Sequence, residues 1–295
     1  MLRTLFSALV IIPGLLLAQP ASPLDAAAHL QQARLAYGAA QYDVALTHAD
    51  SAISMDETIP GGYKLRGDIR QRQQNLHGAL LDYTRAEKLN DQDARLYVSR
   101  SAIHVTEGRV KEAMRDADRA IDLDPKDPDA WYNRACANYI GQNWDGALRD
   151  LDRSLDLRPN DALALLLRGV VHGALYQDEK GLADLEAALA IDPKIPSVTM
   201  SLAVQLFEAK RYAEAIPHFT TVIDAGDVDL KEAHYYRADC HYNLQDKEAA
   251  CADWRASGEL GDKDAQFIVR NYCNTDEEKI PRKPQRKPRK SVIEF

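Results

Sequence analysis

The sequence lacks the short motifs that mark most enzymes. It contains no Gly-rich phosphate loop, no G-x-S-x-G nucleophile motif and no H-E-x-x-H zinc motif. Those patterns are the usual signs of nucleotide chemistry, acyl transfer and metal-dependent hydrolysis. Acidic residues are numerous but scattered, and no two of them stand out as an acid–base couple. We therefore predict a protein that is not an enzyme and that needs no cofactor.

An excess of basic charge is also missing. The 295 residues include 37 Lys and Arg against 45 Asp and Glu, which gives a formal net charge of −8. A general nucleic-acid binder normally presents a basic face, so we expect no nucleic-acid partner. Six basic residues lie between Arg282 and Lys290. The chain therefore consists of an acidic body and a short basic tail.

Long apolar runs are absent outside the N-terminus. Arg3 precedes an apolar stretch over residues 5–17, and the small residues Ala18 and Ala21 follow it. This pattern is typical of a secretory signal peptide, and the stretch is short for a membrane span. We predict a signal peptide over residues 1–21, cleaved after Ala18, with an uncleaved anchor as the alternative. The mature chain would then have no integral membrane segment and would lie in the periplasm or outside the cell.

A period of 34 residues dominates the rest of the chain. It is visible in the residues that end helical segments and in a column of alanines, namely Pro125, Pro159 and Pro193, and Ala79, Ala113 and Ala147. Small residues allow two antiparallel helices to approach closely, and Pro ends a helix because it lacks the backbone N–H. One such pair cannot bury its apolar face alone, so neighbouring pairs must stack.

This period and its columns resemble the tetratricopeptide repeat over about residues 26–262. The small residues at repeat position 8 are Ala33, Gly67, Ser101, Ala135, Gly169, Ala203 and Ala238. Those at position 20 are Ala45, Ala79, Ala113, Ala147, Gly181, Ala215 and Ala250. The resemblance implies an all-α fold, a right-handed superhelix (α-solenoid) of about seven helix–turn–helix repeats. It also implies a non-enzymatic scaffold that binds a protein or a peptide.

The repeats are expected over 26–59, 60–93, 94–127, 128–161, 162–195, 196–230 and 231–262, of which the first is the weakest match. Residues 263–273 are predicted to form one further helix that caps the array. Residues 274–295 carry no apolar periodicity, and we predict that they form a disordered basic tail. Nothing in the sequence indicates an oligomeric state.

Two charged columns depart from the family pattern. Position 7, which is usually Leu in the family, is Arg66, Arg100, Arg134, Arg168 and Arg237. Position 23 is Asp82, Asp116, Asp150, Asp184 and Asp253. We predict a ladder of Arg–Asp pairs that sets the register of the packed helices. The alternative is an anion-binding stripe of Arg, for which the neighbouring Asp residues would compete.

The cysteines suggest a covalent link at the C-terminal end. Cys240, Cys251 and Cys273 lie near that end, whereas Cys136 stands apart. The helices that carry Cys251 and Cys273 should run antiparallel around the turn near residues 258–262, and exported proteins favour disulfides. This segment also resembles the C-terminal repeat of exported bacterial tetratricopeptide proteins that share the pair. We predict a Cys251–Cys273 disulfide, with Cys240–Cys251 or free buried thiols as alternatives.

The histidines fall in columns that pack. His104, His172 and His241 occupy position 11, and His29 and His234 occupy position 4. None of them has a recognised zinc spacing. We therefore expect a role in the core or the groove lining and no metal site.

A partner is expected on the concave face, because the resemblance places ligands along the first helices of the repeats. The exposed positions there would be 2, 5, 9, 12 and 13. In repeats four to seven they include Tyr132, Tyr139, Ile140, Leu166, Val170, Met200, Val204, Phe207, Tyr235 and Tyr242. Such an apolar stripe with Tyr residues is typical of a site for a protein or peptide.

Two alternatives remain at this point. The superhelical twist could bury these residues within the stack. The protein could also be a structural or assembly factor that its basic tail tethers to the cell envelope.

Overall fold

The computed structural model describes residues 25–226 and 230–280. The predicted signal peptide, residues 1–21, and residues 281–295 of the predicted tail lie outside the described residues. Within the part of the chain that is described, the secondary structure is helical and no strand occurs. The predicted all-α fold is therefore confirmed.

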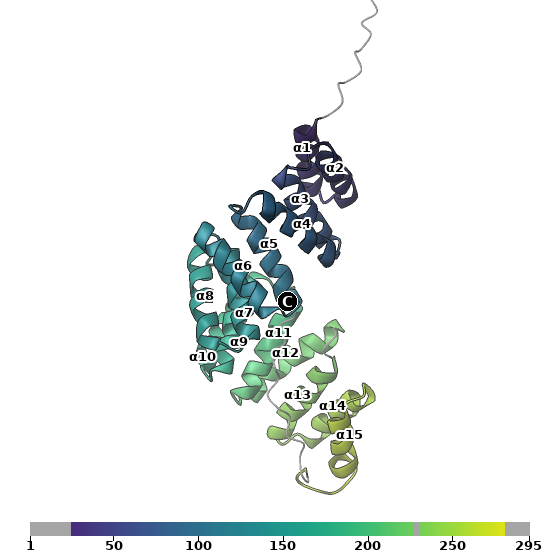
Figure 1. The fold of residues 1–295 in the computed structure, drawn as a ribbon. Helices are drawn as coiled ribbons and strands as arrows, with labels where there is room; N and C mark the ends of the chain where they lie inside the picture. Colours follow the sequence, from purple (N-terminus) through teal and green to yellow (C-terminus); the bar gives the residue numbers. More distant parts are fainter. Residues whose placement is uncertain (1–24, 227–229, 281–295) are drawn as a thin grey trace, which may run out of the picture.

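Helices joined by short turns form successive pairs along the chain (Figure 1). In chain order the pairs are α1 (Ala26–Gly38) and α2 (Tyr42–Met55), α3 (Pro60–Arg72) and α4 (Leu76–Leu89), α5 (Ala94–Thr106) and α6 (Val110–Leu123), α7 (Pro128–Ile140) and α8 (Trp144–Leu157), α9 (Ala162–Ala174) and α10 (Asp178–Ile191), α11 (Pro196–Glu208) and α12 (Tyr212–Ala225), and α13 (Leu230–Asn243) and α14 (Lys247–Glu259). The helix α15 (Lys263–Ile268) and a π-helix, η1 (Val269–Cys273), follow. Each first helix starts at or within one residue of a predicted repeat start.

Local signals in the sequence determine where the helices begin. Asp93, Asp127 and Asp161 each precede a first helix, and their side chains accept hydrogen bonds from backbone N–H groups of the first turn. These bonds satisfy donors that the helix itself leaves unpaired. Pro60 and Pro128 occupy the first helical position, where the missing N–H has no partner to lose.

Small residues bring the two helices of a pair together. A Cβ atom on Gly67 would lie 2.6 Å from the Tyr83 ring, and one on Gly169 would lie 2.9 Å from the carbonyl oxygen of Gly181. Both distances are shorter than a carbon atom tolerates. Larger residues in these columns would therefore push the paired helices apart.

The first helices form the inner layer of the stack. Each packs on the second helix before it and also touches the neighbouring first helices, as α7 does with α5 and α9. The apolar side chains merge into one large cluster that extends from Val105 on α5 to Cys240 on α13. Each repeat therefore depends on its neighbours for burial.

The predicted Arg–Asp ladder is present in all five repeats that carry it. In each, the guanidinium group donates two hydrogen bonds of 2.6–3.0 Å to the Asp carboxylate sixteen residues later. The pairs are Arg66–Asp82, Arg100–Asp116, Arg134–Asp150, Arg168–Asp184 and Arg237–Asp253. The Asp residues are at most 8% exposed, so these are bidentate, largely buried pairs.

The same Arg residues also link each repeat to the one before it. Arg66 donates to Asp50 on α2, Arg134 to Asp118 on α6, and Arg168 to Asp152 on α8, at 2.7–2.8 Å. Arg237 donates to the Thr220 hydroxyl on α12, and Arg100 to Glu87 on α4. The ladder therefore sets the register between repeats as well as within them.

A disulfide closes the C-terminal end. Cys251 on α14 and Cys273 at the end of η1 are bonded, with their Cα atoms 5.6 Å apart. The structure therefore contains the preferred pairing and neither alternative. Cys136 and Cys240 are free and buried.

The chain beyond the disulfide differs from the prediction. Residues 274–280 were expected to begin the disordered tail, but they pass the start of α14 and end in an apolar cluster. The Lys247 ammonium donates to the carbonyl oxygens of Thr275 and Glu277 at 3.0 and 2.8 Å. Ile280 is 8% exposed and belongs to the cluster of Tyr235 and Trp254. One apolar residue in a polar run has no periodicity, which explains why the sequence pattern did not reveal it.

Candidate functional site

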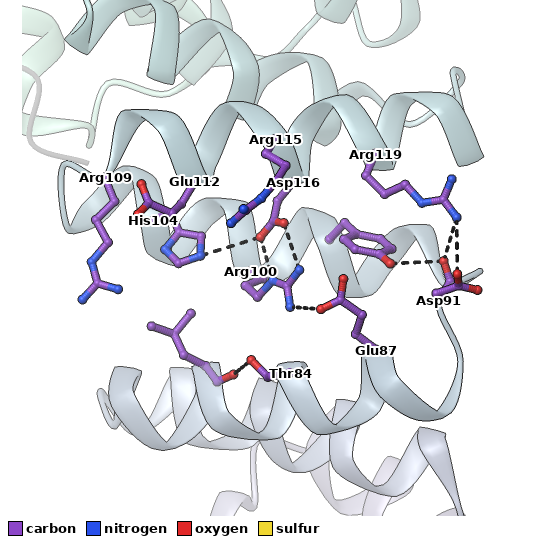
Figure 2. Close-up of a pocket in the computed structure, with 12 residues that line it drawn as sticks. Thr84, Glu87, Asp91, Arg100, His104, Arg109, Glu112, Arg115, Asp116 and Arg119 are labelled. Carbon is purple, nitrogen blue, oxygen red and sulfur yellow. Dashed lines mark hydrogen bonds and ion pairs between the residues drawn. The ribbon is translucent and has the colours of Figure 1, made fainter.

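A polar pocket of about 830 Å³ lies between α4, α5 and α6 (Figure 2). Tyr97, Arg100 and His104 of α5 form its floor, and the second helices α4 and α6 form its walls. The pocket lies where the ladder changes. Position 25 is Asp in α2, α6 and α8 but Thr84 in α4. Arg100 therefore reaches Glu87, three residues farther along α4.

Most charges in the pocket are paired with one another. Arg100 bonds both Asp116 and Glu87, and the His104 Nε2 atom lies 3.7 Å from the Asp116 carboxylate. The Thr84 hydroxyl donates to a backbone carbonyl of its own helix. Among the residues that line the pocket, no nucleophile lies beside a base. The arrangement is therefore a polar seam between repeats two and three.

The pocket leads to a prediction about pH. Burial lowers the pKa of His104, against an opposing effect of Asp116, so the neutral ring is favoured in the folded protein. The unfolded chain therefore binds the proton first as pH falls. We expect the free energy of unfolding to decrease as pH falls through about 6.5, by up to ~1.4 kcal/mol per pH unit for one group.

Urea unfolding at pH values from about 7.5 to 5.5, above the range of ordinary carboxylates, would measure this slope. The variant His104→Gln should show a shallower slope than the wild type. Equal slopes for the two proteins would contradict the prediction. Burial lowers the pKa of His218 in the same direction, so part of the slope should remain in the variant.

Sequence reasoning did not identify this pocket. Its residues belong to ordinary repeat columns, and Thr84 at position 25, where three other repeats have Asp, also recurs as Thr220 in α12. That substitution is visible in the sequence, but its consequence depends on how far α4 and α6 lie apart.

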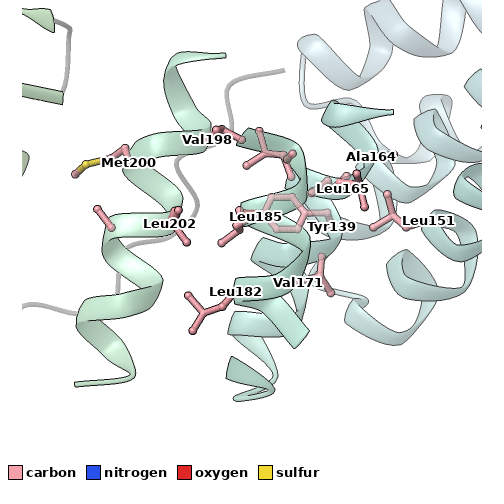
Figure 3. Packing of buried hydrophobic residues seen from close by; sticks show 14 of the residues in the cluster. Tyr139, Leu151, Ala164, Leu165, Val171, Leu182, Leu185, Val198, Met200 and Leu202 are labelled. Atoms are coloured by element: carbon pink, nitrogen blue, oxygen red, sulfur yellow. The ribbon is translucent and has the colours of Figure 1, made fainter. Parts of the chain in front are cut away.

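The predicted partner residues are less exposed than expected. Tyr139, Leu166, Met200 and Tyr235 are 5% exposed or less, which corrects the expectation that they line an open surface. Figure 3 shows Tyr139 and Met200 among other buried side chains of the large cluster. The reason is the stacking of the repeats, since the adjoining helices cover position 5 in repeats five to seven.

Five of the predicted residues remain partly exposed along the first helices of repeats four to six. They pack against the large cluster from one side and are neither fully buried nor fully exposed. We call this set the groove stripe, and it consists of Tyr132, Ile140, Val170, Val204 and Phe207. It offers apolar surface on a rigid base, so binding would require little rearrangement.

Repeat seven does not extend the groove stripe. Tyr242 packs against Trp254 and Tyr272, with ring centroids 5.7 and 5.6 Å apart. Tyr235 belongs to the same cluster, which also contains Ile280. The C-terminal cap therefore uses both of these predicted partner residues.

Cys136 lies beneath the groove stripe without reactive character. Burial raises the pKa of its thiol, and Tyr132 forms a hydrogen bond with it. Burial likewise raises the pKa of Tyr132 well above its usual range. A thiol that stays protonated is a poor nucleophile, so Cys136 adds no nucleophilic chemistry to this surface.

Two carboxylates lie beside the groove stripe, one in repeat five and one in repeat six. Glu208 ends α11 and Asp178 begins α10. Partial burial and then the charge of Asp178 raise the pKa of Glu208, which shows that the two groups are close enough to interact. Neither forms an ion pair within residues 25–226 and 230–280. We call these two residues the acidic edge.

Neither a metal site nor a membrane span occurs in the described part of the chain. His29 and His48 approach to 3.0 Å between their Nδ1 atoms, but no group of three or more His, Cys, Asp or Glu side chains gathers as a metal site among the described residues. None of the described helices is both long and apolar enough to span a membrane.

Comparisons with known proteins agree with this architecture. Two family models described as tetratricopeptide repeat match the chain, one over residues 100–172 and the other over 64–128, 179–229 and 202–257. No curated protein matches the sequence significantly.

Several solved structures have a similar fold. A tetratricopeptide repeat protein from Parabacteroides merdae is 17% identical, with 81% of this chain and 94% of that chain covered and a TM-score of 0.58. Pseudomonas aeruginosa pilF is 17% identical, with 72% of this chain and 96% of that chain covered and a TM-score of 0.61. A chain of the APC/C hetero-tetramer Cut9–Hcn1 is 14% identical, with 73% of this chain and 43% of that chain covered and a TM-score of 0.65. At these identities the likeness concerns the fold alone.

Proposed function

The chain belongs to the tetratricopeptide repeat family, and we propose that it is a non-enzymatic scaffold whose groove stripe binds an apolar or amphipathic segment of another protein. The family as a whole supports a role in protein–protein interaction. The observation that carries the finer proposal is the groove stripe itself. It places partly exposed apolar side chains on three successive first helices, in an otherwise acidic and polar protein.

The energetics favour an extended or helical segment that crosses several repeats. Each first helix contributes one or two side chains, so a ligand that contacts only one repeat would bury little apolar area. Burial contributes about 25 cal/mol per Å², and the scaffold is already ordered, so little of this is lost to rearrangement. The acidic edge beside the stripe favours a segment that also carries basic residues.

A peptide selection tests this proposal and does not require that the partner be identified first. Peptides selected from a random display library on the wild-type protein should be apolar or amphipathic. We expect the double variant Val170→Asn/Val204→Asn to weaken a selected peptide about tenfold or more, which corresponds to ~1.4 kcal/mol. Fluorescence anisotropy with a labelled peptide measures the Kd.

The matched control is Leu81→Asn. Leu81 is an apolar residue on the outer helix α4 and is 59% exposed, so its replacement should leave the Kd unchanged. Far-UV circular dichroism would verify that both variants remain folded. Peptides that bind the double variant as tightly as the wild type would rule out the groove stripe as the site.

We also propose that the protein is exported and acts in the periplasm or outside the cell. The N-terminal pattern supports this, as does the Cys251–Cys273 disulfide, because disulfides persist mainly in oxidising compartments. Mass spectrometry of the protein from fractionated cells should find a mature N-terminus near residues 19–22. An intact chain that begins at Met1 in the cytoplasmic fraction would contradict export.

A second candidate function is a structural or assembly factor of the cell envelope that its basic tail tethers. The six basic residues between Arg282 and Lys290 favour it, since such clusters bind anionic surfaces. Under this alternative, deletion of residues 281–295 would release the protein from the envelope fraction.

A further inference from the structure

We propose that the C-terminal segment 281–295 of this same chain occupies the groove stripe and competes there with the partner. The inference rests on the proposed function, because it assigns a resident competitor to the same surface. Three observations support this occupant. They are the path of the chain up to Ile280, the length that remains, and the charged and apolar residues of the segment.

The described chain already approaches the first-helix side of repeat seven. After η1, residues 274–280 pass the start of α14, where Lys247 donates to two of their backbone carbonyl groups. Figure 1 shows this last described stretch as it bends away from α15. Ile280 is buried in the cluster of Tyr235, and Tyr235 occupies the same repeat position as Met200, Leu166 and Tyr132. The remaining residues therefore start at the end of the groove.

The remaining segment is long enough to follow the groove. It has fifteen residues, including Pro281, Pro284 and Pro288. A Pro-rich segment extends by ~3.1 Å per residue, so it can span about 45 Å. Packed helices lie about 8–10 Å apart, so passing from repeat seven to repeat four takes roughly 30 Å.

The side chains of the segment are complementary to the surfaces of the groove. Its first ten residues carry six positive charges, and its last four include Val292, Ile293 and Phe295. The acidic edge, Asp178 and Glu208, lies beside the groove stripe in repeats five and six, and it forms no ion pair within the described residues. The groove stripe runs from Phe207, whose ring packs on Tyr236 of repeat seven, to Tyr132 in repeat four. Basic residues would therefore meet carboxylates, and the apolar end would meet apolar surface.

Tethering makes this competition effective even if the contact is weak. A segment joined to the body by a few residues is present at an effective concentration of order millimolar. A partner must displace it, so its apparent affinity falls by the fraction of molecules in which the groove is open. We expect a chain that ends at Ile280 to bind a selected peptide about tenfold more tightly than the full chain, which corresponds to ~1.4 kcal/mol.

Zero-length cross-linking of the full chain locates the segment directly. A carbodiimide couples Lys amines to carboxylates that touch them, and mass spectrometry identifies the sites. We expect links from Lys283, Lys287 or Lys290 to Asp178 or Glu208, and a strong reduction of these links at high salt. A mixture of isotope-labelled and unlabelled chains distinguishes links within one chain from links between two copies.

Matched variants separate a specific contact from general attraction to an acidic body. Asp178→Asn/Glu208→Gln should remove the advantage that the shortened chain has over the full chain. Asp122→Asn/Asp145→Asn changes two exposed carboxylates on the outer helices α6 and α8 and should preserve that advantage. Cross-links spread evenly over the acidic surface, or found mainly between two copies, would overturn the inference.

The two proposals fail in different ways. If a selected peptide binds the full and the shortened chain equally, and Val170→Asn/Val204→Asn still weakens it, only the inference about the segment is wrong. If no peptide depends on the groove stripe in either chain, the proposed function is wrong as well.

Discussion

Replacement of Arg100 by Ala is expected to lower the free energy of unfolding by about 3–5 kcal/mol. The guanidinium group donates two hydrogen bonds to Asp116 and one to Glu87, and Arg100 is 8% exposed. Its removal leaves the Asp116 carboxylate, which is 1% exposed, without its ionic partner. The cost comes from this stranded charge rather than from the intrinsic strength of the pair.

Urea unfolding followed by circular dichroism measures this loss, and native-state hydrogen exchange locates it. Protection should fall first in α5 and α6. Arg115→Ala is the control, because Arg115 is an exposed Arg of the same pocket that forms no ion pair among the described residues. It should change stability by less than ~0.5 kcal/mol. Equal effects of the two substitutions would contradict a stabilising role of the ladder.

Loss of the Cys251–Cys273 disulfide is expected to destabilise the C-terminal cap by about 3 kcal/mol. The bond closes a loop with a sequence separation of 22, and a loop of this length corresponds to that figure in the chain-entropy account. In a stack of repeats the loss should be local, because each unit contacts mainly its neighbours. The double variant Cys251→Ser/Cys273→Ser should therefore open α15 and η1 before the rest.

Hydrogen exchange of the double variant, and of the wild type with and without a reductant, tests this expectation. The reductant should weaken protection of α14, α15 and η1 in the wild type and have no effect on the double variant. Cys240→Ala removes a free buried thiol and should leave the response to reductant intact. A uniform loss of protection over all repeats would show that the bond stabilises the whole stack instead.

Much of the fold follows from the sequence because the repeat is a local unit. Helix starts at 26, 60 and 94 follow from Pro, Asp and small residues at fixed offsets. The Arg–Asp ladder was also predictable, because positions 7 and 23 lie on the two helices of one pair and face each other in every repeat. Similarly, Cys251 and Cys273 flank one turn at similar distances.

The candidate site was only partly predictable. The sequence indicated the first helices of repeats four to six, but it did not distinguish Val170 and Val204, which remain partly exposed, from Leu166 and Met200, which do not. The family pattern assigns each residue a position along one helix of the repeat. The exposure of a position, however, depends on how the neighbouring repeat is rotated over it. The burial of Ile280 was likewise not predictable, because it depends on a contact between segments that the 34-residue period does not relate.

The sequence by itself determined the absence of the common catalytic motifs, the period, the helix pairs, the ion-pair ladder and the pairing of the two C-terminal cysteines. All of these depend on residues within one repeat length, where spacing alone fixes geometry. Only the tertiary structure decided which apolar residues stay accessible, where the pocket opens between α4 and α6, and where the chain turns after the cap. Those features depend on the small rotation between successive repeats, which arises from the packing of many side chains together.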